Sequence, residues 1–115
     1  MGYKIPVLLL VISGVLYYLF APVPPLSDAE LSSHLHNKVV LICGASSGIG
    51  EELAYQMAGF GAKLVLVARS QDKLDAVRDG VLKLGVSEED VRTIAFDFSD
   101  VNGSGGVVDQ TVEWF

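Results

Sequence analysis

Three glycines, at positions 44, 48 and 50, are the residues of this chain whose spacing most directly indicates chemistry. They lie in the sequence Cys-Gly-Ala-Ser-Ser-Gly-Ile-Gly, residues 43–50. Gly44 would turn the chain sharply, Gly48 would let the backbone approach a phosphate, and Gly50 would let a helix pack closely on a strand. The start of that helix would offer free N–H groups to an anion. The pattern predicts a phosphate-binding turn; the alternative is a tight strand-to-helix turn without a ligand.

An arginine follows the glycine turn by about twenty residues, where a dinucleotide site places the side chain that contacts the adenine ribose. Arg69, in Val-Ala-Arg-Ser, occupies this position, at which Asp or Glu would select NAD. A guanidinium can bind a 2′-phosphate through bidentate hydrogen bonds, and the hydroxyls of Ser70 and Ser46 can donate further ones. The sequence therefore predicts NADP(H) rather than NAD as the ligand. The alternative is an ordinary surface arginine at the start of a helix.

A carboxylate closes a later apolar run, in the sequence Phe-Asp-Phe-Ser-Asp. Asp97 could accept a hydrogen bond from the exocyclic amine of an adenine, and the N–H of Phe98 could donate one to a ring nitrogen. The alternative for Asp97 is a carboxylate that caps a turn, and both interpretations stay open. Asp100 is expected to be a turn residue.

These residues must be positioned by strands and helices that alternate along the chain. Alternation of this kind implies right-handed crossovers and a parallel sheet with the strand order 3-2-1. The predicted fold class is α/β: the N-terminal βαβαβ half of a Rossmann-type doubly wound parallel sheet, with its first two strands buried. The predicted strands are 39–43, 63–68 and 91–96. The first predicted helix is 51–58, the second follows Ser70 and runs to Leu84, and the chain ends inside a further helix.

Each of the first two helices is expected to cover the sheet with one apolar stripe. Ser70 is the predicted N-cap of the second helix, and Gly85 is its stop. The stripe of the first helix is Ile49, Leu53, Ala54, Met57 and Ala58, and that of the second is Leu74, Val77, Val81 and Leu84.

An apolar segment opens the chain and is followed by three prolines. Residues 1–23 are predicted to form a signal anchor or transmembrane helix, about 24 Å long over 6–21, against a hydrocarbon core of about 30 Å. A short spanning helix, a monotopic anchor, a signal peptide and a buried core helix stay open, although no small-x-small cleavage site follows. We expect a retained anchor in the endoplasmic reticulum membrane. The positive charge of Lys4 favours a cytosolic N-terminus, which would place the domain in the lumen.

Residues 24–37 are interpreted as a proline-rich linker that ends in a short amphipathic helix over 28–35. Ser27 and Glu30 have the spacing of a capping box. Two histidines lie in this segment, but they have no Cys or carboxylate partners at metal-ligand spacing. No metal site is therefore predicted.

The composition of the 115-residue chain restricts its partners. A net charge of −6 argues against a nucleic-acid ligand. The single cysteine, Cys43, excludes an internal disulfide and is expected to be a small buried hydrophobe. Asn102-Gly103-Ser104 is a glycosylation sequon, and the alternative is an unused sequon in a flexible loop.

Residues 38–115 resemble the N-terminal, dinucleotide-binding half of a short-chain dehydrogenase/reductase. The resemblance rests on Gly-Ala-Ser-Ser-Gly-Ile-Gly, on Arg69 after the second predicted strand and on Asp97 after the third. The apolar segment, the proline spacer and the arginine resemble membrane-anchored members of that family. The resemblance implies that the turn holds the diphosphate and ribose, Arg69 the 2′-phosphate, and the end of the third strand the adenine. With Ser70 added, the cofactor-binding residues are Gly44, Ser46, Ser47, Gly48, Ile49, Gly50, Arg69, Ser70, Asp97 and Phe98.

The same resemblance indicates which catalytic groups to look for. The family's chemistry uses Tyr-x-x-x-Lys, an upstream serine and Asn-Asn-Ala-Gly, whereas no tyrosine here is followed four residues later by lysine. No catalytic residue is assigned, and these residues alone, as a truncated half-domain, are expected to be inactive. The intact enzyme is expected to transfer hydride between NADP(H) and an alcohol or ketone. Steroids, retinoids and other small apolar lipids are its candidate substrates, and a homodimer is its candidate assembly.

Two alternatives to that function stay open. The chain could be a truncated isoform or a nucleotide-binding module that has a regulatory role and no catalysis. A weaker alternative is a Rossmann domain that binds a nucleotide sugar or S-adenosylmethionine.

Overall fold

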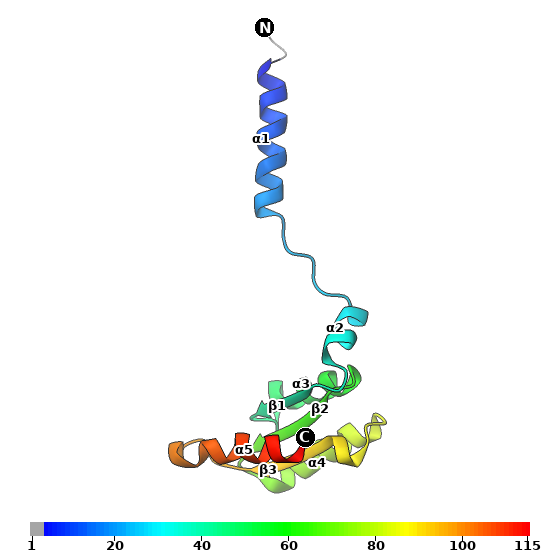
Figure 1. Cartoon of the computed structure of the whole chain (residues 1–115), viewed down its shortest axis with the longest axis vertical. Coiled ribbons are helices and arrows are strands. Elements are labelled where there is room, and N and C mark those ends of the chain that lie inside the picture. The colour runs from blue at the N-terminus through cyan, green and yellow to red at the C-terminus, as the bar shows by residue number, and fades with distance from the viewer. Residues whose placement is uncertain (1–3) are drawn as a thin grey trace.

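The computed structural model describes residues 4–115, and helices alternate with strands in its α/β part (Figure 1). The first helix projects away from that part, to which it is joined by an extended segment over residues 21–27 and by a second, short helix. The elements are α1 (Lys4–Phe20), α2 (Asp28–Leu35), β1 (Val39–Cys43), α3 (Gly48–Gly59), β2 (Lys63–Ala68), α4 (Gln71–Lys83), η1 (Glu88–Asp90), β3 (Val91–Ala95), η2 (Val101–Gly103) and α5 (Ser104–Trp114).

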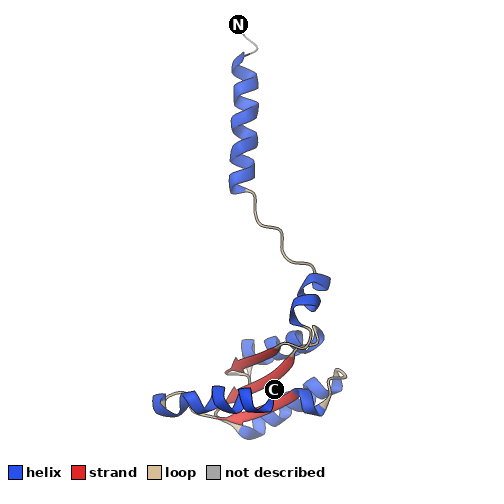
Figure 2. Cartoon of the chain, in the orientation of Figure 1, coloured by secondary structure: helices blue, strands red, loops and turns tan. Residues whose placement is uncertain are grey.

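Three parallel strands form one sheet in the order β1-β2-β3, so β2 lies in the centre (Figure 2). In the register of the strands, Leu41 pairs with Val65 and Val65 pairs with Arg92. Helices α3 and α4 pack on one face of the sheet, and α5 packs on the other. This is the β-α-β-α-β arrangement of a Rossmann-like fold, and the predicted strand order is confirmed.

The central strand β2 supplies much of the core because its side chains alternate between two covered faces. Leu64 and Leu66 are fully buried beneath α3 and α4, whereas Val65 and Val67 are fully buried on the side of α5. Burial of each such side chain contributes roughly 1.5–3 kcal/mol. The buried strand predicted over 63–68 from its Leu- and Val-rich sequence is therefore confirmed.

Strand β1 is covered less than its apolar sequence predicts. Ile42 is buried, but Val39 is 41% exposed and Cys43 is exposed. The cause is the position of the strand: β1 pairs with β2 on one side and, within residues 4–115, with no strand on the other. The expectations of a first strand covered on both faces and of a buried Cys43 are wrong for this structure.

The face that α3 turns to the sheet also differs from the prediction. Ala54 and Ala58 are buried, whereas Ile49 is 89% exposed and Leu53 is 38% exposed. A Cβ built on Gly50 would collide with the carbonyl oxygen of residue 44, so this row of small residues, spaced four apart, makes the close contact. The row that contains Ile49 and Leu53 begins one residue earlier and is rotated by about 100° around the helix. Only its last member, Met57, is half-buried against the core.

Helix α4 buries the apolar side chains that its sequence predicts, with one exception. Leu74, Val77 and Val81 are buried, but Leu84 is 58% exposed because the helix ends at Lys83. The predicted stop is confirmed, since Gly85 follows with a φ of +93°.

The contact between α3 and α4 explains a glycine in the interior of a helix. Gly80 lies in α4, where glycine costs about 1 kcal/mol relative to alanine. A Cβ built there would lie 2.7 Å from the hydroxyl oxygen of Tyr55 and 2.9 Å from Cε1 of its ring. That hydroxyl donates a hydrogen bond to Oε1 of Glu51 at 2.9 Å. Gly80 therefore makes room for a tyrosine that is held between the two helices.

Helix α2 forms over the predicted residues and has both hydrogen bonds of a capping box. The N–H of Ser27 donates to Oε2 of Glu30 at 2.8 Å, and the N–H of Glu30 donates to Oγ of Ser27 at 3.3 Å. The hydrogen bond from the backbone of Ser27 lowers the pKa of Glu30. The capping box predicted at the start of α2 is thus confirmed.

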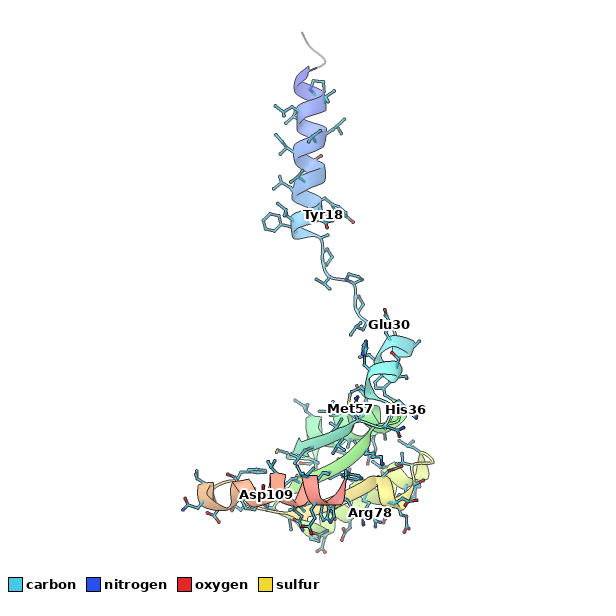
Figure 3. All side chains as sticks on the ribbon, viewed as in Figure 1. Tyr18, Glu30, His36, Met57, Arg78 and Asp109 are labelled. Carbon is cyan, nitrogen blue, oxygen red and sulfur yellow. The ribbon has the colours of Figure 1, made fainter. Side chains whose placement is uncertain are left out.

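Helix α1 exposes apolar side chains on all sides, and Figure 3 shows Tyr18 at the end nearer the linker. The helix has 17 residues, which corresponds to about 25 Å at 1.5 Å per residue. In the part of the chain that the structure describes, no helix is both long enough and apolar enough to cross a membrane. The predicted spanning helix is therefore not confirmed.

Candidate functional site

A cleft of about 460 Å³ opens at the carboxyl ends of the three strands. This is the edge of a parallel α/β sheet at which ligands bind. It is formed by the glycine turn after β1, by the end of β2 with the start of α4, and by the segment after β3. The lining residues are Gly44, Ser46, Ser47, Ala68, Arg69, Ser70, Lys73, Phe96, Asp97 and Phe98.

The glycine turn has the backbone conformation that its sequence predicts. Gly44 and Gly48 have φ values of +74° and +58°, in the left-handed region that glycine adopts at low cost. The N–H groups of Gly44 and Ala45 both donate to the carbonyl oxygen of Val67, at 2.7 and 3.2 Å. Backbone hydrogen bonds to the central strand therefore hold the turn in place.

Helix α3 begins directly after this turn, and no side chain caps its first N–H groups. Ser47 is the N-cap residue, and its side chain forms no capping hydrogen bond. The first turn therefore offers backbone donors and the positive end of the helix dipole to an anion.

Three of the predicted residues do not line the cleft. Gly50 is packed against the turn itself, while Gly48 and Ile49 line a separate apolar hollow on the outer side of α3. The side chain of Ile49 is almost fully exposed, and its predicted contact with the cofactor stays a prediction.

The second strand brings Arg69 and Ser70 to the cleft, as predicted. Arg69 is exposed and follows the last residue of β2. Ser70 is the N-cap residue of α4, but its hydroxyl makes no capping hydrogen bond. Within residues 4–115, no carboxylate lies within ion-pair distance of Arg69. Its guanidinium is therefore available to an anionic ligand.

The third strand brings Asp97 and Phe98 to the opposite side of the cleft. Oδ1 of Asp97 accepts a hydrogen bond from the N–H of Ser99 at 2.9 Å, so this carboxylate caps a turn. The same N–H is the main cause of the lowered pKa of Asp97, and the nearby charge of Arg69 acts in the same direction. The turn interpretation is thus observed, and the contact with adenine stays a prediction. Asp100 contributes its N–H to this turn, donated to the carbonyl oxygen of Asp97 at 3.0 Å.

The sequence pattern of one protein family, short chain dehydrogenase, matches residues 38–115. The chain belongs to the short-chain dehydrogenase family. An 11-beta-hydroxysteroid dehydrogenase-like 2 of Arabidopsis thaliana is 43% identical over 104 residues, which cover 88% of this chain and 33% of that protein. A dehydrogenase/reductase SDR family protein 7-like of Anopheles gambiae is 45% identical over 90 residues, which cover 76% of this chain and 28% of that protein. The chain thus spans about a third of the length of these relatives.

One similar solved structure contains a bound nicotinamide cofactor. The L-sorbose reductase of Gluconobacter frateurii, solved in complex with NADPH and L-sorbose, superposes with a TM-score of 0.63 and 36% sequence identity. The match covers 70% of this chain and 30% of the reductase. The matched part of this chain includes the Rossmann-like sheet on which the cleft is built.

Two residues that line the cleft, Phe96 and Lys73, were missed by sequence reasoning. Phe96 follows β3, and its ring meets that of Phe98 edge to face with centroids 5.0 Å apart, which forms an apolar wall. Lys73 lies in the first turn of α4. The spacing of Arg69 and Lys73, four residues apart across a helix start, is the signal that could have identified the second cation.

Other predicted sites lie apart from the cleft. Asn102 is exposed on η2, so the sequon is accessible, and its use stays a prediction. Nδ1 of His36 would lie 2.6 Å from a Cβ built on Gly61, which places this histidine against the turn between α3 and β2.

Proposed function

We propose that this chain is the NADP(H)-binding part of a short-chain dehydrogenase that oxidises alcohols or reduces ketones. The observation that carries the proposal is the cleft itself, which combines the glycine turn, an aromatic wall after β3 and an arginine after β2 that has no ion pair within residues 4–115. The structural relative that is solved with NADPH supports the same cofactor.

Each part of the cleft suits one part of the cofactor. The glycine turn and the uncapped start of α3 present N–H groups to the diphosphate. Arg69 and Ser70 offer a guanidinium and a hydroxyl to the 2′-phosphate, which NAD(H) lacks. Asp97 and Phe98 would hold the adenine. When bound, the nicotinamide ring accepts or supplies the hydride.

The catalytic groups of the reaction are proposed to lie outside these 115 residues. Tyr55 is the one tyrosine of the α/β part, and its hydroxyl is committed to Glu51. Burial, followed by this hydrogen bond, raises the pKa of Tyr55, which is the opposite of what a tyrosine that acts as a base requires. Small apolar alcohols or ketones, including steroids, retinoids and other lipids, are the proposed substrates of the whole enzyme, for which a homodimer is the proposed assembly.

Because the hydroxyl of Tyr55 is bonded to Glu51 and its pKa is raised, a second function without catalysis is also a candidate. A chain that binds NADP(H) and carries no proton-transfer group would act as a nucleotide-binding module with a regulatory role. Turnover distinguishes the two: oxidation of NADPH by a ketone in the presence of the whole protein supports the enzyme, and binding without turnover supports the module.

We further propose that α1 attaches the protein to a membrane surface. Apolar side chains surround the helix, and its hydroxyl at Ser13 is satisfied internally by donating to the carbonyl oxygen of Leu10 at 2.9 Å. The endoplasmic reticulum membrane, with the α/β part in the lumen, is the proposed location. A mobility shift that a glycosidase removes, and that Asn102→Gln abolishes, would support lumenal exposure.

Flotation with phosphatidylcholine vesicles tests the membrane proposal. Leu9→Asp places a charge on the apolar surface of α1, where Leu9 is 61% exposed, and should abolish flotation. Val112→Asp, at a 72% exposed apolar position of α5, is the matched control and should still float. Equal flotation of both variants would contradict the role of α1.

Limited proteolysis tests the cofactor proposal. NADPH should protect the full chain more than NADH does, and Arg69→Glu should remove that difference because a carboxylate repels the 2′-phosphate. Arg78→Glu, a charge reversal on α4 outside the cleft, is the matched control and should keep it. Equal protection by NADPH and NADH would contradict the assignment of Arg69.

A further inference from the structure

A second cation lies in the cleft, and the glycine and arginine motifs assign it no role. Lys73, the third residue of α4, lines the same cleft as Arg69, Ser70 and Ser46. The next residue, Leu74, is fully buried in the core and fixes the rotation of this helical turn. Lys73 is therefore held on the exposed side of the turn that faces the cleft.

The charge of Lys73 is not neutralised by the residues around it. Within residues 4–115, no carboxylate lies within ion-pair distance of its ammonium group. Asp75, two residues further along, instead accepts a hydrogen bond from Nε2 of Gln71 at 2.7 Å. Gln71 also donates to Oγ1 of Thr93 at 3.0 Å, which ties this amide to β3. Gln71 and Asp75 thus have partners, whereas the charge of Lys73 stays available to a ligand.

The cleft has a positive balance in an otherwise acidic protein. Arg69 and Lys73 supply two positive charges, and Asp97 is the carboxylate of the lining. One oxygen of Asp97 already accepts the N–H of Ser99. A concave positive site on a chain of net charge −6 concentrates anions at that site.

Two cations suit the ligand chemistry better than one. A phosphate monoester carries about −1.5 to −2 charges near neutral pH, so a single guanidinium leaves part of that charge uncompensated. Arginine provides bidentate hydrogen bonds to the phosphate, and lysine provides a compact point charge. Both cations flank the start of α4, where Ser70 forms no side-chain cap and the helix dipole adds a partial positive charge.

We propose that Lys73 is the second cation of the 2′-phosphate subsite and, with Arg69, determines the preference for NADP(H) over NAD(H). The inference rests on the proposed NADP(H)-binding function. NAD(H) carries a hydroxyl where NADP(H) carries the phosphate, so the contribution of Lys73 is confined to the phosphorylated cofactor.

Paired titrations of the full chain with NADPH and NADH test this role. Lys73→Gln should weaken NADPH binding about tenfold and leave NADH binding within about twofold, because one charge-assisted contact is lost. The salt dependence of NADPH binding should become shallower in the same variant. Lys83→Gln removes an exposed lysine from the last turn of the same helix, outside the cleft, and should change neither affinity.

The outcomes separate this inference from the function on which it rests. If the unsubstituted chain binds NADPH and Lys73→Gln leaves its affinity unchanged, or weakens NADPH and NADH equally, Lys73 is not a specificity residue. The NADP(H) proposal survives that result. If the unsubstituted chain binds neither cofactor, both proposals are overturned.

Discussion

Gly50→Ala is expected to force the glycine turn and α3 apart, because a Cβ at this position would collide with the carbonyl oxygen of Gly44. It would also lie 2.8 Å from the carbonyl carbon of Gly44 and 3.1 Å from Cα of Ala45. All three neighbours are backbone atoms, so no side-chain rotation relieves the contact. The turn cannot move freely either, since the N–H of Gly44 is bonded to the carbonyl oxygen of Val67.

The expected loss of stability follows from these contacts. Overpacking costs about 1–3 kcal/mol, and the upper value applies where both sides are backbone. The better helix propensity of alanine returns about 1 kcal/mol, which leaves a net loss of about 2 kcal/mol. At roughly 4–8 °C per kcal/mol for a domain of this size, Tm should fall by about 8–16 °C. Circular dichroism of the full chain during heating and in urea measures this change.

Gly59→Ala is the matched control in the same helix. Nothing lies within 4 Å of a Cβ built on Gly59, so this variant should keep the stability of the parent or gain up to about 1 kcal/mol. The reasoning would be refuted if the two variants melted at the same temperature.

Three further substitutions test other contacts. Gly80→Ala should cost about 1–2 kcal/mol because its methyl group meets the Tyr55 ring, and a double-mutant cycle with Tyr55→Leu should recover most of this cost; additive losses would contradict the contact. The hydrogen bond from Ser99 lowers the pKa of Asp97, so its stabilising effect is present above the unfolded pKa of about 3.9 and disappears as the pH falls through the lower folded value. Asp97→Asn should remove this pH-dependent contribution to stability, which urea midpoints measured across that pH range would show. A pH profile identical to that of the parent would contradict the role of Asp97. Phe98→Ala should weaken NADPH and NADH equally, about tenfold in titrations, because both carry the adenine; a loss confined to one cofactor would exclude an adenine contact.

Local sequence signals predict most of the element boundaries in this chain. The strands predicted over 39–43 and 63–68 begin and end where β1 and β2 do, because Gly44 directly follows the first and Gly61 precedes the second. Ser27 and Glu30 likewise mark the start of α2, since their reciprocal hydrogen bonds are formed within four residues. Such signals need no knowledge of distant parts of the fold.

Exposure and helix orientation depend instead on contacts between distant segments. The apolar rows that begin at Ile49 and at Gly50 have the same helical spacing, and only the close approach to the glycine turn selects the second. Cys43 belongs to a run as apolar as that of β2, but its exposure follows from the edge position of β1. The spacing of apolar residues alone therefore predicts neither the buried face of α3 nor the exposure of Cys43.

The candidate site shows the same division. Arg69 and Asp97 could be predicted because fixed offsets from the glycine turn and the strands place them at the sheet edge. Phe96 could not be assigned to the cleft, since its contribution depends on how the end of β3 lies against the rest of the site. The spacing of Lys73 from Arg69 makes it a candidate in the sequence, but only the position of the first turn of α4 shows that it lines the cleft.

Nuclear magnetic resonance of the isotope-labelled full chain, titrated with NADPH and with NADH in detergent micelles, tests the central claim most directly. The account predicts that NADPH shifts the amide signals of residues 44–50, 69–70 and 97–98. The signals of residues 84–87, which line a different hollow beyond the C-terminal end of α4, should stay unchanged. NADH should produce a weaker response, with the smallest change at residues 69–70. Shifts that avoid the glycine turn, or identical responses to the two cofactors, would contradict the account.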